Sequence, residues 1–462
     1  MITVKLTFKD FCISIGIILI IFVMLLEIVL SYDKWDYHNE MWTLLLSFIP
    51  FSLIFIVGIT FKGVKILHPY LMVSILYFFL FILSPIISIY WGETKCHGDF
   101  VMDGCIKGTY IFLIGFACFT IGYLIPKDTR IRYLRFNPLE KDKKIIIILC
   151  YVIWLIGAIS CMYYIYKSSV ALTALFTNDT MRIMAAFKAV DNSSLKFLAN
   201  FAYFMVFPCI VLAQMEKHKS LFYCILILTL FLFYLRGTRI FIVVLIMAYL
   251  IVFIRVKNYR IRFYQIVVFL FLFLVMISYL GTNRNYVKMG LETVAIEKED
   301  VLHALATNLD IYKPYYGLVA DCPDKVDYTY GNGIFVDSFV SLIPRFLWPE
   351  KRIETPMANM ISKTTGNGPL RAGMSWPNIS EFYMDFGILG VVIFNMLFGF
   401  LVSKSIKWLN SSSLTKVMIY AILFPTYFQL VIRGYTPINF IMYLCLFFPY
   451  ILVSLFFKIK KQ

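Results

Sequence analysis

The sequence predicts an all-α, polytopic integral membrane protein with about twelve transmembrane helices. Apolar residues make up 61% of the 462 residues and charged residues only 15%, a composition that could not remain soluble. The apolar residues fall in runs of about 17 to 22, long enough to cross the hydrocarbon core of a bilayer as helices. These runs do not alternate with polar residues, so we do not expect a transmembrane β-barrel.

Nine of the expected spans precede a large polar loop, and three follow it. The chain therefore divides into residues 1–281 with spans one to nine, a loop at 282–384, and residues 385–462 with spans ten to twelve. We expect the spans at residues 11–30, 41–61, 69–90, 108–125, 145–166, 197–214, 220–235, 239–254, 263–281, 385–403, 415–432 and 438–457.

Membrane topology explains the net charge of +16. If the N-terminus lies inside, the inner segments carry 23 basic and five acidic residues, and the outer segments carry 20 basic and 22 acidic residues. Basic residues accumulate on the cytoplasmic side of membrane proteins. The sequence therefore predicts both termini inside and the large loop outside, and nucleic-acid binding is not needed to explain the charge.

Four arginines stand at span ends on the predicted outer face: Arg236, Arg239, Arg284 and Arg433. Arginine at a membrane boundary is costly unless it reaches lipid phosphate or binds another anion, and both interpretations stay open. Guanidinium groups donate bidentately to phosphate oxygens, so a lipid diphosphate is the ligand that we expect here. The glycine that follows Arg236 and Arg433 would permit the close approach of a bulky anion.

The large loop contains further cations beside a short apolar segment. Residues 334–348 are too few and too polar to span, so we expect an interfacial or re-entrant helix there. This helix would bring Arg345 to the membrane edge, with Arg352 after it. We expect Arg284 and Arg345 to take part in catalysis, and Arg352 to bind diphosphate with the other arginines.

Two carboxylates lie where the chain re-enters the membrane after the loop. Glu381 and Asp385 are four residues apart and would share one face of a helix. Either could act as a general base that accepts a proton from a sugar hydroxyl. Either could instead pair with an arginine and hold the loop in place. Glu381 is our candidate for the base, and the two roles stay open.

Aromatic and amide side chains of the loop region are candidates for contacts with sugars. The tyrosines at 312–317 and 328–333 lie among turn-forming residues. Such tyrosines can stack on sugar faces or lie at a membrane interface, and both interpretations stay open. The glycan-contacting candidates are Tyr286, Tyr316, Trp376 and Asn378.

The sequence gives no indication of metal or nucleotide chemistry. None of the five histidines has a second metal ligand at a useful spacing, and no nucleotide-binding or zinc-protease motif occurs. We therefore expect no metal and no cofactor. Cys96 and Cys105 share an outer loop, where a disulfide bridge and two free thiols are both open.

At these residues the chain resembles the bacterial oligosaccharide repeat-unit polymerases, the O-antigen polymerases of the Wzy type. The resemblance rests on Arg236–Gly237 at a span end, on Ile343–Arg345 followed by Pro349 and Lys351, and on the spaced pattern of Asn378–Gly390. It covers roughly residues 230–405. The chain departs from the family pattern at Arg352, which stands where a proline usually follows the motif lysine.

The resemblance implies a GT-C-like membrane glycosyltransferase of lipopolysaccharide biosynthesis. Such an enzyme, in the bacterial inner membrane, moves a growing glycan from undecaprenyl diphosphate onto an incoming lipid-linked repeat unit at the periplasmic face. The partners it implies are the undecaprenyl-diphosphate-linked oligosaccharide, membrane lipids, a chain-length regulator and a flippase.

Two other functions are compatible with the sequence. An O-antigen ligase would use the same donor but transfer to lipid A core. A lipid-linked oligosaccharide transporter, or flippase, shares the twelve-span layout, but it should show similar halves and charges within its spans. Here the ionisable residues gather at the outer ends, which favours an enzyme.

Overall fold

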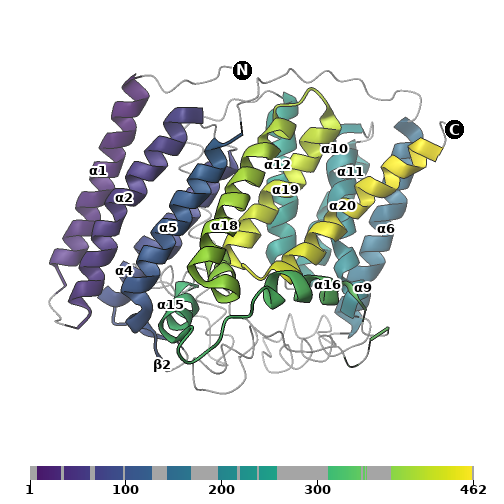
Figure 1. The fold of residues 1–462 in the computed structure, drawn as a ribbon. Coiled ribbons are helices and arrows are strands. Elements are labelled where there is room, and N and C mark those ends of the chain that lie inside the picture. The colour runs from purple at the N-terminus through teal and green to yellow at the C-terminus, as the bar shows by residue number, and fades with distance from the viewer. Residues whose placement is uncertain are drawn as a thin grey trace, which may run out of the picture.

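The computed structural model describes residues 8–32, 36–62, 68–96, 99–126, 143–167, 196–215, 219–236, 239–257, 311–344, 347–348, 350 and 376–459. Long helices run side by side through these residues, and short helices lie across one end of them (Figure 1). The first part of the chain contains α1 (Phe8–Leu30), α2 (His38–Lys62), α3 (Pro69–Phe78), η1 (Phe79–Leu83), α4 (Ser84–Tyr90), η2 (Met102–Gly104), α5 (Cys105–Leu124) and α6 (Lys143–Lys167), with a short antiparallel pair β1 (Lys95–Cys96) and β2 (Asp99–Phe100).

The regular elements in the rest of the described chain are all helices. It contains α9 (Lys196–Ala199), η3 (Asn200–Met205), α10 (Val206–Met215), α11 (Lys219–Leu235), α12 (Arg239–Lys257), α15 (Tyr312–Asp321), η4 (Asn332–Val336), α16 (Asp337–Leu342), α18 (Asn378–Leu409), α19 (Leu414–Ile432) and α20 (Thr436–Ile459).

The helices confirm the predicted class, a multi-pass membrane protein built from helices. Within the described ranges, seven helical segments are long and apolar enough to cross a membrane. Helices occupy eleven of the twelve expected spans, and the ninth, 263–281, lies outside the described residues. The start of α1 lies at the end of the bundle opposite α15 and α16 (Figure 1). The number of spans and the direction of insertion stay predictions.

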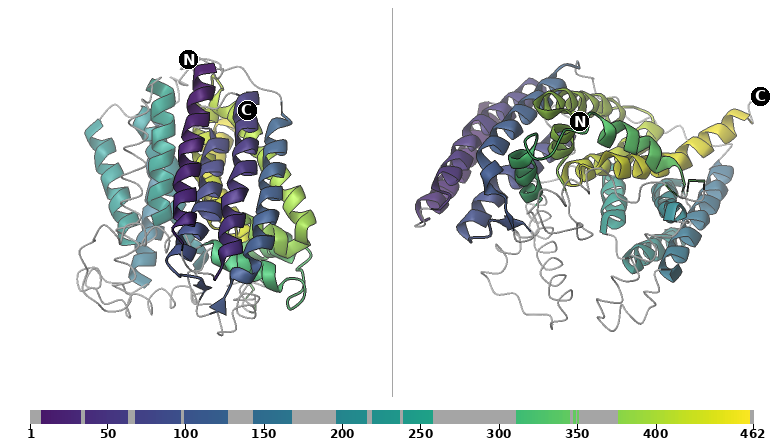
Figure 2. Two further views of the ribbon diagram at one scale, coloured as in Figure 1. Left: turned by 90° about the vertical axis from the view of Figure 1, so that its left-hand side faces the viewer. Right: turned by 60° about the horizontal axis from the view of Figure 1, so that its bottom comes forward.

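Two hydrophobic cores divide the bundle into two groups of helices. The first core joins α1 to α5 with α15 and part of α18. The second core joins α6, α10, α11 and α12 with α20. Helix α19 contributes to both, with Tyr427 in the first and Tyr420 in the second. Figure 2 shows the two groups on either side of the helices that connect them.

A kink at Phe386 and Gly387 divides α18 into two helices. Gly387 has φ +61° and ψ −145°, a conformation essentially reserved for glycine. Residues 378–385, which we call the entry helix, are thereby set apart from the long apolar helix that follows. Sequence analysis predicts helical residues here but not the kink. Gly390 has a packing role, because a Cβ there would lie 2.1 Å from the carbonyl oxygen of Phe382.

The tyrosines of α15 lie in the protein core. Tyr312, Tyr315 and Tyr316 are fully buried, and the Tyr315 hydroxyl donates to the carbonyl oxygen of Gly108 at 2.8 Å. Gly104, which ends η2, lets α15 approach closely, since a Cβ there would lie 1.9 Å from the Tyr316 carbonyl oxygen. The structure therefore places these side chains neither at a sugar-binding surface nor at a membrane interface.

The short helix expected at 334–348 is present as η4 and α16, and it ends at Leu342, before Pro344. Pro344 lacks the backbone N–H that a continuing helix would need. Phe335, Val336 and Phe339 are at least half exposed, which gives the helix an apolar face. It lies across the ends of longer helices (Figure 1). Its location at the membrane interface stays a prediction.

Cys105 carries a free thiol and is fully buried in the first core. The bridge between Cys96 and Cys105 is therefore not formed. The reason is that Cys105 begins α5 and its side chain packs inward with the α15 tyrosines.

Candidate functional site

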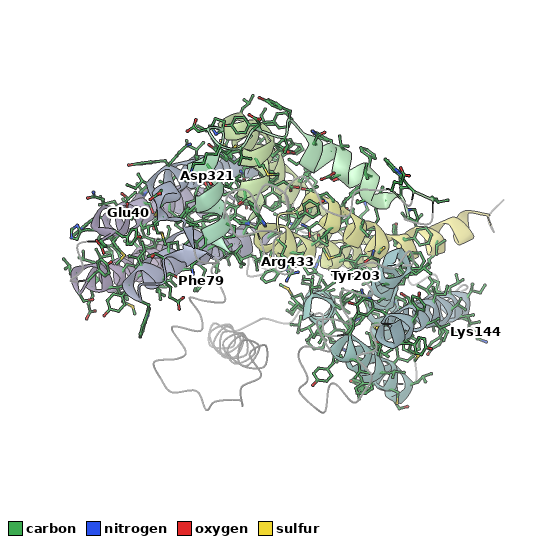
Figure 3. The ribbon with its side chains drawn as sticks, turned by 90° about the horizontal axis from the view of Figure 1, so that it is seen from below. Glu40, Phe79, Lys144, Tyr203, Asp321 and Arg433 are labelled. Carbon is green, nitrogen blue, oxygen red and sulfur yellow. The ribbon has the colours of Figure 1, made fainter. Side chains whose placement is uncertain are left out.

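The candidate site is built around the entry helix, at the end of the bundle that holds α15 and α16. Three segments meet the entry helix there: η4, the turn between α19 and α20, and α3. In Figure 3, which views this end, Arg433 and Tyr203 lie where the two groups of helices join. The site is thus formed by residues far apart in the sequence.

Asn378 fastens the start of the entry helix to α3. Its amide nitrogen donates to the Tyr77 hydroxyl at 2.8 Å, and the same hydroxyl can donate to the Asn378 side-chain oxygen at 3.1 Å or to that of Asn395 at 3.3 Å. All three side chains are fully buried. Buried polar groups of this kind need internal partners, so Asn378 has a positioning role here and does not lie at a surface open to a glycan.

Glu381 binds the first residue of α20. The backbone N–H of Thr436 lies 3.0 Å from both Glu381 carboxylate oxygens, and the Thr436 hydroxyl donates to Oε2 at 2.5 Å. The first N–H groups of a helix have no partner within the helix. Glu381 is fully buried and supplies an acceptor for one of them.

Asp385, one turn later, does the same for η4. Its carboxylate accepts from the backbone N–H groups of Gly333 at 3.3 Å and Ile334 at 2.8 Å, and from the Thr329 hydroxyl. The Tyr330 N–H also donates to the Asp385 carbonyl oxygen at 2.9 Å. Within the described part of the chain, neither carboxylate pairs with an arginine; both bind the start of a helix.

The turn between α19 and α20 is fixed closely against the entry helix. The Gly434 N–H donates to the Trp376 carbonyl oxygen at 2.5 Å, and a Cβ on Gly434 would lie 2.4 Å from backbone atoms of Asn378. The close approach that Gly434 allows is therefore to the chain itself, whereas the sequence suggests approach to an anion. Arg433 is exposed beside this turn, and Asn439 donates to its carbonyl oxygen at 2.6 Å.

Arg236 lies on the other side of the junction and is 7% exposed. Its guanidinium carbon lies 4.4 Å from the centre of the Tyr164 ring and 4.2 Å from that of Phe241, an arrangement that cation–π attraction stabilises. Its Nη1 donates to the Ala199 carbonyl oxygen at 2.6 Å. Arg236 has no carboxylate partner among the described residues.

Tyr203 lies within electrostatic range of both arginines, and sequence analysis does not identify it. The charges of Arg236 and Arg433 both lie close enough to interact with its hydroxyl. Its ring stacks on Phe241 at 4.0 Å. A tyrosine in an apolar helix is common, so no sequence signal distinguishes this one. Arg236 and Arg433 therefore both lie near Tyr203, and their binding of a diphosphate stays a prediction.

The remaining candidate side chains are either buried or outside the described part of the structure. Trp376 is buried and acts through its carbonyl oxygen, and Tyr316 is in the first core, so neither side chain is open to a glycan in this structure. Arg239 begins α12, but its side chain lies outside the described part. No group of three potential metal ligands occurs among the described residues. Four candidates lie outside the described residues altogether: Arg284, Tyr286, Arg345 and Arg352.

Fold and site together define a multi-pass helical membrane protein with cations and carboxylates gathered at one end of the bundle. The chain belongs to the O-antigen polysaccharide polymerase Wzy family, whose family model matches residues 12–462. The family resemblance is thereby confirmed, and it extends over essentially the whole chain. No curated protein and no solved structure matches it. Membership implies an O-antigen polymerase, a glycosyltransferase-type enzyme of polysaccharide biosynthesis.

Proposed function

We propose that this chain transfers a growing glycan from undecaprenyl diphosphate onto an incoming lipid-linked repeat unit. The observation that carries the proposal is the family match over residues 12–462. We propose further that the reaction takes place at the end of the bundle that holds the entry helix, and that this end faces the periplasm from the bacterial inner membrane. The charge distribution supports this orientation, because the opposite segments are the basic ones.

The arginines support a diphosphate-bearing donor. Breaking the bond between glycan and carrier leaves negative charge on the departing diphosphate, and donors fixed in advance stabilise such charge by about 3 to 4 kcal/mol each. Arg433 is exposed at the junction, Arg236 belongs to the other group of helices, and the charges of both act on Tyr203. Two aromatic rings pack against the Arg236 guanidinium, and its N–H groups other than the one bound to the Ala199 carbonyl oxygen are the ones that could meet phosphate oxygens.

Four other arginines are candidates for contacts with the same diphosphate. Arg239 begins the helix that follows Arg236, so it belongs to the same end of the bundle. Arg284, Arg345 and Arg352 belong to the large loop in the sequence, and we propose that they contact the same diphosphate. A proton must also leave the acceptor hydroxyl, and Glu381 is the sequence candidate for accepting it.

The experiment that tests the function is incubation of the purified protein with a synthetic polyprenyl-diphosphate-linked repeat unit. A polymerase gives a ladder of products that differ by one repeat unit. A ligase gives product only when lipid A core is supplied. A transporter moves the lipid across a vesicle membrane without forming a glycosidic bond. The absence of a ladder with active, correctly inserted protein would refute the proposal.

A further inference from the structure

We infer that Glu381 is a positioning residue that holds the start of α20 through Thr436 and thereby fixes Arg433, rather than the base that accepts the proton of the acceptor hydroxyl. The inference rests on the proposed function, because it concerns the role of Glu381 in glycan transfer.

The first argument is the set of partners around the carboxylate. Both oxygens of Glu381 accept from Thr436, at 3.0 Å from its N–H, and Oε2 also accepts from its hydroxyl at 2.5 Å. A general base has to reach the hydroxyl of a bound sugar, whereas Glu381 is fully buried. Its geometry is that of a helix cap.

The second argument is the short connection from Thr436 to Arg433. Three contacts fix this turn: Gly434 N–H to the Trp376 carbonyl oxygen, Thr436 to Glu381, and Asn439 to the Arg433 carbonyl oxygen. The first two join the turn to the entry helix and the residues just before it. Loss of the Glu381 carboxylate would release the start of α20. The backbone that carries the exposed Arg433 side chain would then no longer be held in place.

The third argument is the parallel arrangement at Asp385. This carboxylate, on the next turn of the same helix, accepts from two backbone N–H groups at the start of η4. Both acids therefore bind the start of a helix. Their separation of four residues, which resembles that of an acid–base pair, is explained by two helix caps.

Four variants of the full-length protein separate the two roles: Glu381→Gln, Glu381→Ala, Thr436→Val and Thr436→Ser. A positioning role predicts that Glu381→Gln keeps activity within about tenfold, because its amide oxygen still accepts from Thr436. It predicts a loss of kcat/KM for Glu381→Ala, a smaller loss for Thr436→Val, which keeps the backbone N–H contact, and recovery in Thr436→Ser. The double variant E381A/T436V should lose no more than the worse single variant.

A catalytic base predicts the opposite pattern. Glu381→Gln would then lower kcat by about 100-fold or more, and Thr436→Val would retain nearly normal kcat and KM. That result overturns the inference.

Amide hydrogen exchange at residues 433–440 tests the anchor without relying on activity. Glu381→Ala should exchange about tenfold faster there than wild type, and Glu381→Gln should change much less. Unchanged exchange in Glu381→Ala overturns the inference. If the wild-type protein forms no ladder, the proposed function fails, while the exchange comparison still decides whether Glu381 anchors α20.

Discussion

Replacing Gly434 with alanine should move the turn that bears Arg433 and disable the enzyme without unfolding it. The new Cβ would lie 2.4 Å from both Cα and N of Asn378. These backbone atoms cannot rotate away, and ordinary contact between carbon atoms begins at about 3.5 Å. The turn must therefore retreat by about 1 Å, which would stretch the 2.5 Å hydrogen bond from the Gly434 N–H to the Trp376 carbonyl oxygen.

The expected magnitudes follow from these two changes. Overpacking at a closely packed site costs about 1 to 3 kcal/mol, and a lost hydrogen bond costs about 1 kcal/mol. A catalytic group displaced by about 1 Å can lower the rate about 100-fold. We therefore expect a moderate fall in thermal stability and a far larger fall in the rate of glycan transfer.

The assay is the initial rate of ladder formation, measured beside the thermal unfolding midpoint in detergent. Gly16→Ala is the matched control, because Gly16 lies within α1 and a Cβ there meets nothing within 4 Å. It should keep the rate and slightly raise the midpoint, since alanine favours a helix over glycine. A Gly434→Ala protein that polymerises at the wild-type rate would refute the proposed close packing of the turn.

Three further predictions concern the same region. Gly387→Ala should destabilise the protein by about 1 to 3 kcal/mol, because φ is +61° there; a midpoint equal to that of Gly16→Ala would contradict the kink. Arg433→Ala should lower the transfer rate about 100-fold or more, and Arg433→Lys should lower it less. The control Lys416→Ala, at an exposed position near the start of α19, should leave the rate unchanged. Equal rates in all three variants would remove Arg433 from the site. Asp385→Ala should lower the unfolding free energy by about 2 kcal/mol or more, and Asp385→Asn by less, because asparagine keeps one acceptor oxygen; equal midpoints would show that the η4 contact contributes nothing.

Hydropathy predicts the helices well because the requirement for a span is local. A run of apolar residues must satisfy its own backbone in lipid, so its length alone predicts a helix. α2 and α5 begin and end within about three residues of the expected ranges, the usual uncertainty of helix ends. The kink at Gly387 is not predictable in this way, because glycine at a helix interface and glycine at a break have the same sequence appearance.

The roles of the site residues depend on partners that are distant in sequence. Glu381 binds Thr436 and Asp385 binds Thr329, each more than 50 positions away. No helical periodicity connects such residues, so the sequence indicates two acids on one face but not what they bind. The burial of Tyr315 and Tyr316 is missed for a similar reason: it depends on Gly104 and Gly108, about 200 positions earlier in the chain.

The two carboxylates bind helix ends and not arginines in the described part of the protein. At the start of α20 and of η4, backbone N–H groups lack partners within their own helices, and leaving them unpaired away from water is costly. Glu381 and Asp385 satisfy these groups, and in the described part of the protein neither neutralises an arginine. An acid that formed an ion pair with Arg433 would compete with a diphosphate for the same N–H groups. Glu381 therefore holds the turn that bears Arg433, and neither acid competes with a phosphate for the Arg433 guanidinium.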